Sequence, residues 1–485
     1  MRHPRLPFAT ALFAAAACAG EPPPPAVPPW SAGEGAPLAI TRVAVVDVNA
    51  GDAGSALLRD RTVLVRHGRI AAVGPAREVR IPRDARVVDG RGKFLVPGLW
   101  DAHAHVSHAG PGALPVYAAH GVTSVRDLGG RLPVLLAWRR QVREGTLAGP
   151  ELFVAGPAVE GAYWLDPVLA LFSSDSVLRA YPFLERSPRL RVSSPAGALA
   201  AVDSLRRLGV DLVKFRNVRG DEARALLSEA RRLGIPVAGH APGGMGLGEA
   251  ADSGVRSIEH VETAMLRLGD AGPAARRAEF ARIARAGTAL TPTLLTDRVY
   301  RQTPDSVARA AIADTAGLLN PRRRRVSRGL LENWRFGLET KRLEGPNDWA
   351  GSHRRQVADL RLAHEAGVPI LVGTDLGVAL VYPGSGVHEE MRLLVEEGGL
   401  SPFDALRGAT VLPARSLGVH GRVGAVYPGL EADLVLLDAD PLRDVAHTER
   451  IRAVVLDGRL FTRAELDALL EEGERMAWAT FGAGR

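Results

Sequence analysis

The chain has 485 residues, of which 46% are hydrophobic and 24% are charged, and its formal net charge at pH 7 is +7. This is the composition of a globular protein that is long enough for two or three domains. The arginines that carry the charge are scattered and accompany no DNA- or RNA-binding motif, so that we expect no nucleic acid among the partners. Cys18 is the only cysteine, which excludes a disulfide within this chain.

Residues 1–37 are predicted to be an export signal followed by a linker. Two arginines precede an apolar stretch, Leu6–Ala17, that is too short to span a membrane as a stable helix. The residues that end at Cys18, Ala-Ala-Ala-Cys, resemble a relaxed lipobox, whose cysteine receives lipid in a bacterial lipoprotein; cleavage in the same alanine-rich zone without lipidation is the alternative. Pro22–Pro29 is predicted to be a stiff tether. These features predict export to the bacterial cell envelope, either periplasmic or with a lipid anchor to the membrane.

Strand-like sequence patterns occur at both ends of the remaining chain. Leu38–Asp47, Arg61–Val73 and Ala85–Val88 are rich in β-branched residues that alternate with polar ones, and turn signals separate them. They predict a small β-domain. The same pattern returns in Ala425–Asp438 and Arg452–Leu460.

Between these ends, eight short apolar runs are predicted to be strands, and helical segments separate most of them. Such alternation indicates an α/β fold with a parallel sheet, and eight repeats indicate a closed (β/α)8 barrel, here in residues 97–414. The eight runs are Leu99–Val106, Val122–Asp127, Leu152–Ala155, Leu212–Phe215, Val237–His240, Ser257–His260, Ala289–Leu294 and Ile370–Asp375.

Two insertions interrupt this pattern. Glu160–Ser194 follows the third expected strand, and Leu295–Val368 separates the seventh from the eighth. Loops that follow barrel strands form the rim of the active site. The insertions are therefore predicted either to carry substrate contacts or to be additional packing helices.

Polar residues stand at the carboxyl ends of five of these runs, where parallel barrels carry their functional side chains. His103 and His105 are two residues apart on one expected strand, so that both side chains point to one face with about 7 Å between their Cα atoms, close enough to share one metal ion. Two later runs end on a histidine and the last on a carboxylate: His240, His260 and Asp375. Each is compatible with a hydrogen-bonded strand end, but their repetition favours a metal site.

Lys214 ends another of these runs. The chain has 61 lysines and arginines together, and because only Lys93, Lys214 and Lys341 are lysines, the other 58 are arginines. The pKa of a lysine amine falls on burial, whereas an arginine stays charged and cannot act as a neutral nucleophile. A neutral amine can capture carbon dioxide and become a carbamate, whose two oxygens can bridge two metal ions. The alternative is a strand-end lysine whose amine reaches water.

Together, the His-x-His pair, the strand-end lysine, the two later histidines and Gly373-Thr374-Asp375 resemble the amidohydrolase superfamily of metal-dependent hydrolases. The closer likeness is to its imidazolonepropionase-like and Xaa-Pro dipeptidase-like branch. It extends from Leu38 to Arg459 and is also carried by Gly121–Asp127 and Gly429–Val435. The resemblance implies a TIM-like barrel together with a small composite β-sandwich domain formed by the N- and C-terminal segments, residues 38–96 and 415–485.

The resemblance also implies a ligand set and a mechanism. Two divalent metal ions, expected to be Zn²⁺, would be bridged by Lys214 carboxylated on its amine. Asp375 would be catalytic, taking a proton from a metal-bound hydroxide and passing it to the departing nitrogen. The expected ligands are His103, His105 and Asp375 for the first ion and His240 and His260 for the second.

Three functions are compatible with these residues. The favoured one is hydrolysis of an amide or peptide-like C–N bond in a small molecule. The second is a mononuclear hydrolase of a cyclic amide, like imidazolonepropionase, in which Lys214 is not carboxylated. The third is a non-catalytic, envelope-tethered binding protein. Because every expected ligand is present, the sequence argues against the third.

The substrate contacts are predicted less directly. Tyr163, Arg216 and His388 lie in segments that follow barrel strands, and Arg216 or Arg219 is suited to hold a substrate carboxylate. Dipeptidase-like relatives carry a glycine-rich stretch soon after the strand-end lysine, where this chain has Phe215–Arg219. This difference argues against specificity for proline dipeptides. We also expect a homo-oligomer.

Overall fold

The computed structural model describes residues 36–181, 185, 187–341 and 347–479. The predicted export signal, Cys18 and the linker Pro22–Pro29 lie outside these ranges, so that export and lipidation stay predictions. Within the described ranges, no helix has both the length and the apolar character needed to cross a membrane.

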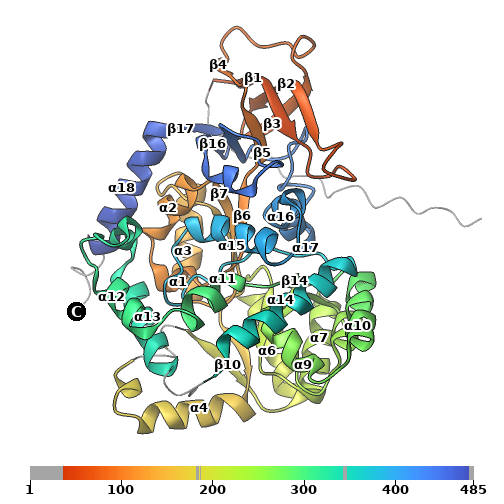
Figure 1. The fold of residues 1–485 in the computed structure, drawn as a ribbon, viewed down its shortest axis with the longest axis vertical. Coiled ribbons are helices and arrows are strands. Elements are labelled where there is room, and N and C mark those ends of the chain that lie inside the picture. Colours follow the sequence, from red (N-terminus) through yellow and green to blue (C-terminus); the bar gives the residue numbers. More distant parts are fainter. Residues whose placement is uncertain (1–35, 182–184, 186, 342–346, 480–485) are drawn as a thin grey trace, which may run out of the picture. The chain divides into compact units, whose positions relative to one another are not determined.

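Strands from the N-terminal and C-terminal parts of the described chain form one eight-stranded sheet, shown in red and blue in Figure 1. Its order is β17-β16-β15-β5-β1-β2-β3, and β4 pairs with β1. β15 runs antiparallel to β5, with Leu434 opposite Pro97. The strands are β1 (Leu38–Val46), β2 (Leu57–Arg66), β3 (Arg69–Pro75), β4 (Arg86–Asp89), β5 (Phe94–Pro97), β15 (Leu434–Leu437), β16 (Ile451–Leu456) and β17 (Arg459–Thr462).

Alternating side chains of this sheet form a hydrophobic cluster to which both parts of the chain contribute. Along a strand, every second side chain faces the same side, and a bulge in β1 after Ile40 restores the same facing at Val43. The buried members of the cluster include Leu38, Ile40, Val43, Val45, Val63, Val65, Leu95, Leu434, Leu436, Ala453 and Val455. The two-layer sandwich and the domain boundaries expected from the sequence stay predictions.

The middle of the chain forms two parallel sheets, one ordered β10-β9-β11-β12-β13-β14 and the other β6-β7-β8. Seven of the eight expected strands have a counterpart among these strands. β10 is an addition that lies in the first insertion. The strands are β6 (Leu99–Ala104), β7 (Val122–Asp127), β8 (Glu151–Val154), β9 (Ala158–Gly161), β10 (Arg189–Val192), β11 (Val213–Arg216), β12 (Val237–Gly239), β13 (Val255–Glu259) and β14 (Ala289–Thr291).

The third expected strand, Leu152–Ala155, corresponds to β8, and a further strand that was not expected, β9, follows it after a break at Gly156. Gly156 has a φ of 66°, which a regular strand does not allow, and a proline follows it. Both strands lie beside β11: the amide of Asp211, just before β11, donates to the carbonyl of Val154 on β8 at 2.9 Å, and Glu160 on β9 pairs with Arg216 on β11.

The eighth expected strand, Ile370–Asp375, is not a continuous strand. Its backbone pairs with β14 through Ile370, and the chain then pairs with β6 through Leu376. Asp375 has a φ of 56°, in the left-handed region, so that the segment leaves the extended conformation where it carries its carboxylate. The amide of Asp375 donates to the carbonyl of His103 at 2.7 Å, which holds the bend against β6.

Helices follow most of the parallel strands, and α7 (Gly220–Leu233) shows how the sequence specifies them. Acidic residues occupy its first turn and arginines its last, as the helix dipole favours, and Gly234 ends it with a φ of 65°. Its apolar residues recur every three or four positions and are buried: Ala223, Leu226, Leu227 and Ala230.

The remaining described helices lie between the parallel strands, in the two insertions, and after β14. The first insertion carries α4 (Ala162–Ser174) and η1 (Leu178–Ala180). The second carries α11 (Leu294–Thr296), η2 (Asp297–Arg301), α12 (Asp305–Ala313), η3 (Pro321–Arg325), α13 (Arg328–Lys341) and α14 (Trp349–Glu365). The others are α1 (Val106–Ala109), α2 (Ala113–Ala119), α3 (Leu132–Arg143), α6 (Pro195–Arg207), α8 (Leu247–Asp252), α9 (Val261–Leu268), α10 (Pro273–Ala286), α15 (Ser385–Glu396), α16 (Pro402–Gly408), α17 (Val411–Ser416), η5 (Val445–Glu449) and α18 (Arg463–Ala479).

Candidate metal centre

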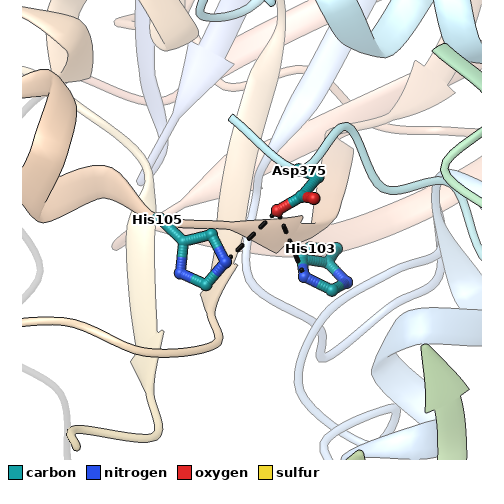
Figure 2. Close-up of side chains that lie close together, drawn as sticks. All are labelled: His103, His105 and Asp375. Atoms are coloured by element: carbon teal, nitrogen blue, oxygen red, sulfur yellow. Dashed lines mark ion pairs between the residues drawn. The ribbon is translucent and has the colours of Figure 1, made fainter. Parts of the chain in front are cut away.

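Three of the predicted ligands converge at the end of β6. One ligand atom from each of His103, His105 and Asp375 lies within 4.8 Å of the other two, and no other such group of histidine, cysteine and acidic side chains occurs among the described residues. Figure 2 shows both imidazoles turned toward one carboxylate. The Nε2 atoms of His103 and His105 lie 3.5 Å and 3.2 Å from Oδ1 of Asp375. The arrangement is suited to a divalent cation held by nitrogen and oxygen donors.

A hydrogen bond from its other ring nitrogen orients each imidazole. Nδ1 of His103 donates to Oε2 of Glu259 at 2.8 Å, and Nδ1 of His105 donates to the carbonyl of Gly129 at 3.0 Å. Both Nε2 atoms face Asp375. Hydrogen bonds of this kind fix the tautomer and the ring orientation of histidines that ligate metals. Burial, and then the charge of Lys214, lower the pKa of His103 to about 4, which keeps the ring neutral.

Glu259 is a functional residue that the sequence pattern did not single out. Its side chain is fully buried on β13, where Oε1 accepts a hydrogen bond from Arg126 at 2.7 Å and another from Ser257. Burial raises the pKa of Glu259, but the charge of Arg126 and the hydrogen bond from His103 outweigh it and hold that pKa well below its usual range. An acidic residue directly before the strand-end His260 was the available signal.

Asp101 ties β6 to the segment that carries Asp375. Its Oδ1 accepts hydrogen bonds from the amides of Thr374 at 3.0 Å and His103 at 3.3 Å. Its Oδ2 accepts from the hydroxyls of Tyr117 at 2.8 Å and Thr374 at 2.6 Å. One buried carboxylate thus uses both oxygens to hold the two chain segments that present the ligands.

The other predicted ligands lie next to this group. The ring centroid of His260 is 4.6 Å from that of His103 and 5.0 Å from that of His240. Nδ1 of His260 is hydrogen-bonded to Oγ1 of Thr293 at 2.7 Å. Burial and nearby positive charges hold the pKa values of His240 and His260 well below the usual value, so that both rings are neutral, the form that binds metal. Their role as ligands of a second ion stays a prediction.

Lys214 lies on β11, opposite Ala238 of the neighbouring strand β12, which His240 follows. Its side chain is 1% exposed, and Nζ has no hydrogen-bond partner among the described residues. The charge of Lys214 contributes, after burial, to the lowered pKa of His103, His240 and His260. Burial lowers the pKa of Lys214 itself to about 7. The amine does not reach water, so that the snorkelling alternative is wrong.

The three predicted substrate contacts differ in their surroundings. His388 is buried in α15 rather than on a loop, with Nδ1 bonded to Oγ1 of Thr448 at 2.9 Å and Nε2 donating to the carbonyl of His120 at 3.0 Å. Because both ring nitrogens are occupied, the structure assigns His388 a packing role in place of a substrate contact. Tyr163, at the start of α4, is 41% exposed. Arg216 ends β11 and is half-buried.

Comparison with known proteins gives the site a context. A profile described as Amidohydrolase family matches residues 94–461. The chain is 24% identical to an ochratoxinase from Aspergillus niger, over 83% of each chain. It is 27% identical to an imidazolonepropionase from Ralstonia nicotianae, over 86% of this chain and 97% of the relative. It is similar to the crystal structure of a Xaa-Pro dipeptidase with methionine bound in the active site, with a TM-score of 0.64 and 22% identity over 88% of this chain and 100% of that one. These matches confirm the resemblance that the motifs indicated.

Proposed function

The chain belongs to the amidohydrolase family of hydrolases, and from this premise we propose that it cleaves an amide or peptide-like C–N bond in a small molecule with the help of two divalent metal ions. One observation carries the metal dependence of this proposal: the ligand atoms of His103, His105 and Asp375 converge within 4.8 Å in a largely buried site. Imidazole and carboxylate donors favour Zn²⁺ and related ions over Ca²⁺ or Mg²⁺.

The surrounding residues fit a second ion. His240 and His260 are neutral and adjacent, and His260 contacts the His103 ring. Lys214 supplies a buried amine without a hydrogen-bond partner among the described residues. A buried polar atom that is left unmatched is costly, so that its presence here favours a partner from outside the polypeptide.

The amine of Lys214 is suited to form a carbamate. With its pKa lowered to about 7 by burial, a large fraction of Lys214 is neutral near neutral pH. A neutral amine adds to the carbon of carbon dioxide through its lone pair and releases one proton, which gives an anionic carbamate. The nitrogen then carries a carboxylate with two oxygens that can act as ligands, and the charge near the three histidines changes from neutral to negative. Both changes favour binding of two cations.

The protein residues then have separate roles in hydrolysis. When bound, the ions would lower the pKa of a water molecule and polarise the substrate carbonyl. Burial raises the pKa of Asp375, but the neighbouring histidines outweigh it and hold that pKa well below its usual range, so that its carboxylate is ionised. Asp375 accepts the proton of the attacking water and passes it to the departing nitrogen. Glu259 and Gly129 hold the imidazoles of His103 and His105 in place during this step.

A mononuclear site is the second candidate. It is favoured by one observation: among the described residues, only His103, His105 and Asp375 bring their ligand atoms within 4.8 Å of one another. In that case Lys214 would stay an amine, and the substrate would be a cyclic amide, as the name of the imidazolonepropionase relative suggests.

Metal counting separates the candidates. Protein purified with zinc is analysed for metal per chain, stripped with a chelator, reloaded, and assayed at each stage on dipeptides, N-acyl amino acids and cyclic amides. The binuclear proposal expects two ions per chain and hydrolysis that is lost and regained with them. One ion at full activity supports the mononuclear site. Bound metal without hydrolysis of any substrate in the panel contradicts both.

The wider architecture and location are also proposals. Because β8 and β9 lie beside β11, and Ile370–Leu376 pairs with both β14 and β6, we propose that the parallel strands close into a barrel.

The basic and apolar residues before Cys18 support export to a bacterial envelope, with or without lipid on that cysteine. Mass spectrometry of the native N-terminus tests this: an intact Met1 contradicts export, and an unmodified Cys18 contradicts the anchor. A homo-oligomer stays a prediction.

A further inference from the structure

A second buried charge cluster lies beside the metal centre, on the strands β10, β9 and β11. Glu160 on β9 is fully buried, and the parallel register sets it directly beside Arg216 on β11. Nε of Arg189, on β10, donates to Oε2 of Glu160 at 3.0 Å, and Nδ2 of Asn217 donates to Oε1 at 2.7 Å. Both oxygens of Glu160 are therefore already matched without Arg216.

Arg216 has no comparable partner. Its Nε lies 3.9 Å from Oε2 of Glu160, beyond hydrogen-bond distance, and is buried without a hydrogen bond among the described residues. One carboxylate thus faces two guanidinium groups, and the amine of Lys214 lies on the same strand. Burial, and then the charge of Arg216, lower the pKa of Arg189 to about 9. A partly buried cation that is left unmatched is destabilising unless an anion joins it.

The position of Arg216 connects this cluster with the metal centre. Arg216 and Lys214 are two residues apart on β11, so that their side chains point to the same face of the sheet. The Arg216 side chain is 26% exposed, and its guanidinium carbon lies 5.7 Å from the centroid of the Trp164 ring. A ligand thus has access to the guanidinium.

We propose that Arg216 binds a carboxylate of the substrate at the edge of the metal centre, so that the enzyme selects acylated amino acids or peptides that present a free carboxylate near the cleaved C–N bond. The selection of substrates for cleavage rests on the proposed hydrolysis. The binding of a carboxylate by Arg216 does not depend on it. Glu160 and Arg189 are positioning residues for this binding, because their own hydrogen bond leaves Nε of Arg216 without one among the described residues. Trp164 would flank the bound anion.

The test uses N-acyl-L-amino acids and dipeptides, each paired with its carboxamide, which has the same C–N bond but lacks the negative charge. For each pair that is hydrolysed, kcat/KM is measured. If no pair is hydrolysed, the binding of N-acetyl-L-leucine and of N-acetyl-L-leucinamide is measured by calorimetry and compared. We expect the acid to be favoured by roughly tenfold or more in the wild type, since hydrogen bonds to charged groups contribute that much. We expect Arg216→Met to abolish the preference and Arg216→Lys to keep part of it.

The matched control is Arg224→Met, an exposed arginine on α7 that pairs with Glu249 and Asp221 and should leave the preference unchanged. Metal content should be equal in all variants. A wild type that treats acids and carboxamides alike, or an Arg216→Met variant that keeps the preference, overturns the carboxylate site. If acids bind better than carboxamides but none is hydrolysed, the carboxylate site stands and the proposed hydrolysis fails.

Discussion

Two neighbouring parts of the candidate site differ in how their polar atoms are satisfied. Around β6, Nδ1 of each imidazole has a protein partner, and Asp101 uses both carboxylate oxygens. Along β11, Nζ of Lys214 and Nε of Arg216 are buried without a hydrogen bond among the described residues. Folding rarely leaves such atoms unmatched. The difference indicates that the polypeptide alone positions the residues around β6. The residues along β11 need hydrogen-bond partners that the described residues do not supply.

The largest effect is expected from removing a predicted metal ligand on β6, where the surrounding polar atoms are hydrogen-bonded. In His103→Ala or His105→Ala, the protein should keep its fold, because the remaining network still joins β6 to Asp375, but it should release metal and lose hydrolysis. Metal analysis and circular dichroism on the same sample check both statements. His364→Ala, a half-exposed histidine of α14, is the control and should retain metal and activity. Full metal occupancy in both ligand variants would show that these histidines hold no ion.

The second prediction concerns Lys214 on β11, whose amine has no hydrogen bond among the described residues. Lys214→Arg keeps the positive charge but can form no carbamate, so that at least one metal ion and most activity should be lost. Lys214→Ala should fail in the same way, and short carboxylates added to the medium should partly restore it by bridging the ions. Metal stoichiometry and turnover measure both effects. An active Lys214→Arg enzyme with two ions would remove the carbamate and leave the mononuclear site.

The contrast between the two parts also separates what the sequence could and could not predict. The spacing of His103 and His105 on a strand, and the apolar runs that end at His240, His260 and Asp375, predicted which residues lie together at this site, because strand periodicity fixes which side chains share a face. The bend at Asp375 was not predictable in this way, since it depends on the hydrogen bond from its amide to the His103 carbonyl, 272 residues earlier in the chain.

The residues that the sequence did not reveal are those whose partners are distant in the chain. Arg126 and Glu259 are 133 residues apart and form a buried pair, yet a charged residue in a strand pattern ordinarily indicates a solvated face. Glu160 and Arg189 lie in the first insertion, which was predicted to carry substrate contacts or packing helices, and no sequence pattern indicated that the two would pair. His388 was placed near the substrate because it follows the last expected strand, but helix α15 begins at Ser385 and turns its ring into the core.

The third prediction compares the loss of Glu259, which is fully hydrogen-bonded, with the loss of Arg216, whose Nε has no hydrogen bond among the described residues. Glu259→Gln leaves Arg126 buried without its counter-charge, which should lower the free energy of unfolding by about 3 kcal/mol. It should also weaken metal binding by roughly tenfold to a hundredfold, because the support of His103 is lost. Arg216→Met removes a cation that lacks a hydrogen bond, and it should leave both quantities close to wild type. Chemical denaturation and metal titration of the two variants check this. If Arg216→Met lowered the free energy of unfolding as much as Glu259→Gln, Arg216 would have a hydrogen-bond or ion-pair partner in solution.

The smallest effect is expected at a third, fully matched group in the second insertion. Nδ1 of His353, on α14, lies 2.7 Å from Oδ2 of Asp297, and its Nε2 lies 2.5 Å from Oε2 of Glu397. The hydrogen bond to Asp297, followed by that to Glu397, raises the pKa of His353 against the opposing effect of burial. The imidazolium form is therefore more stable in the folded protein than in the unfolded chain.

A raised pKa in the folded state gives a stability contribution of defined sign. The contribution is fully present below the unfolded pKa, about 6.5, and is lost as the pH rises through the higher folded pKa. The difference in unfolding free energy between the wild type and His353→Gln should therefore be largest near pH 6 and decline at alkaline pH. Denaturation at several pH values measures it, with His364→Gln on the same helix as control, because His364 only approaches Asp404 at 3.8 Å. A difference that grows with pH would mean that His353 is neutral in the folded protein, and the matched network would then depend on protonated carboxyl groups instead.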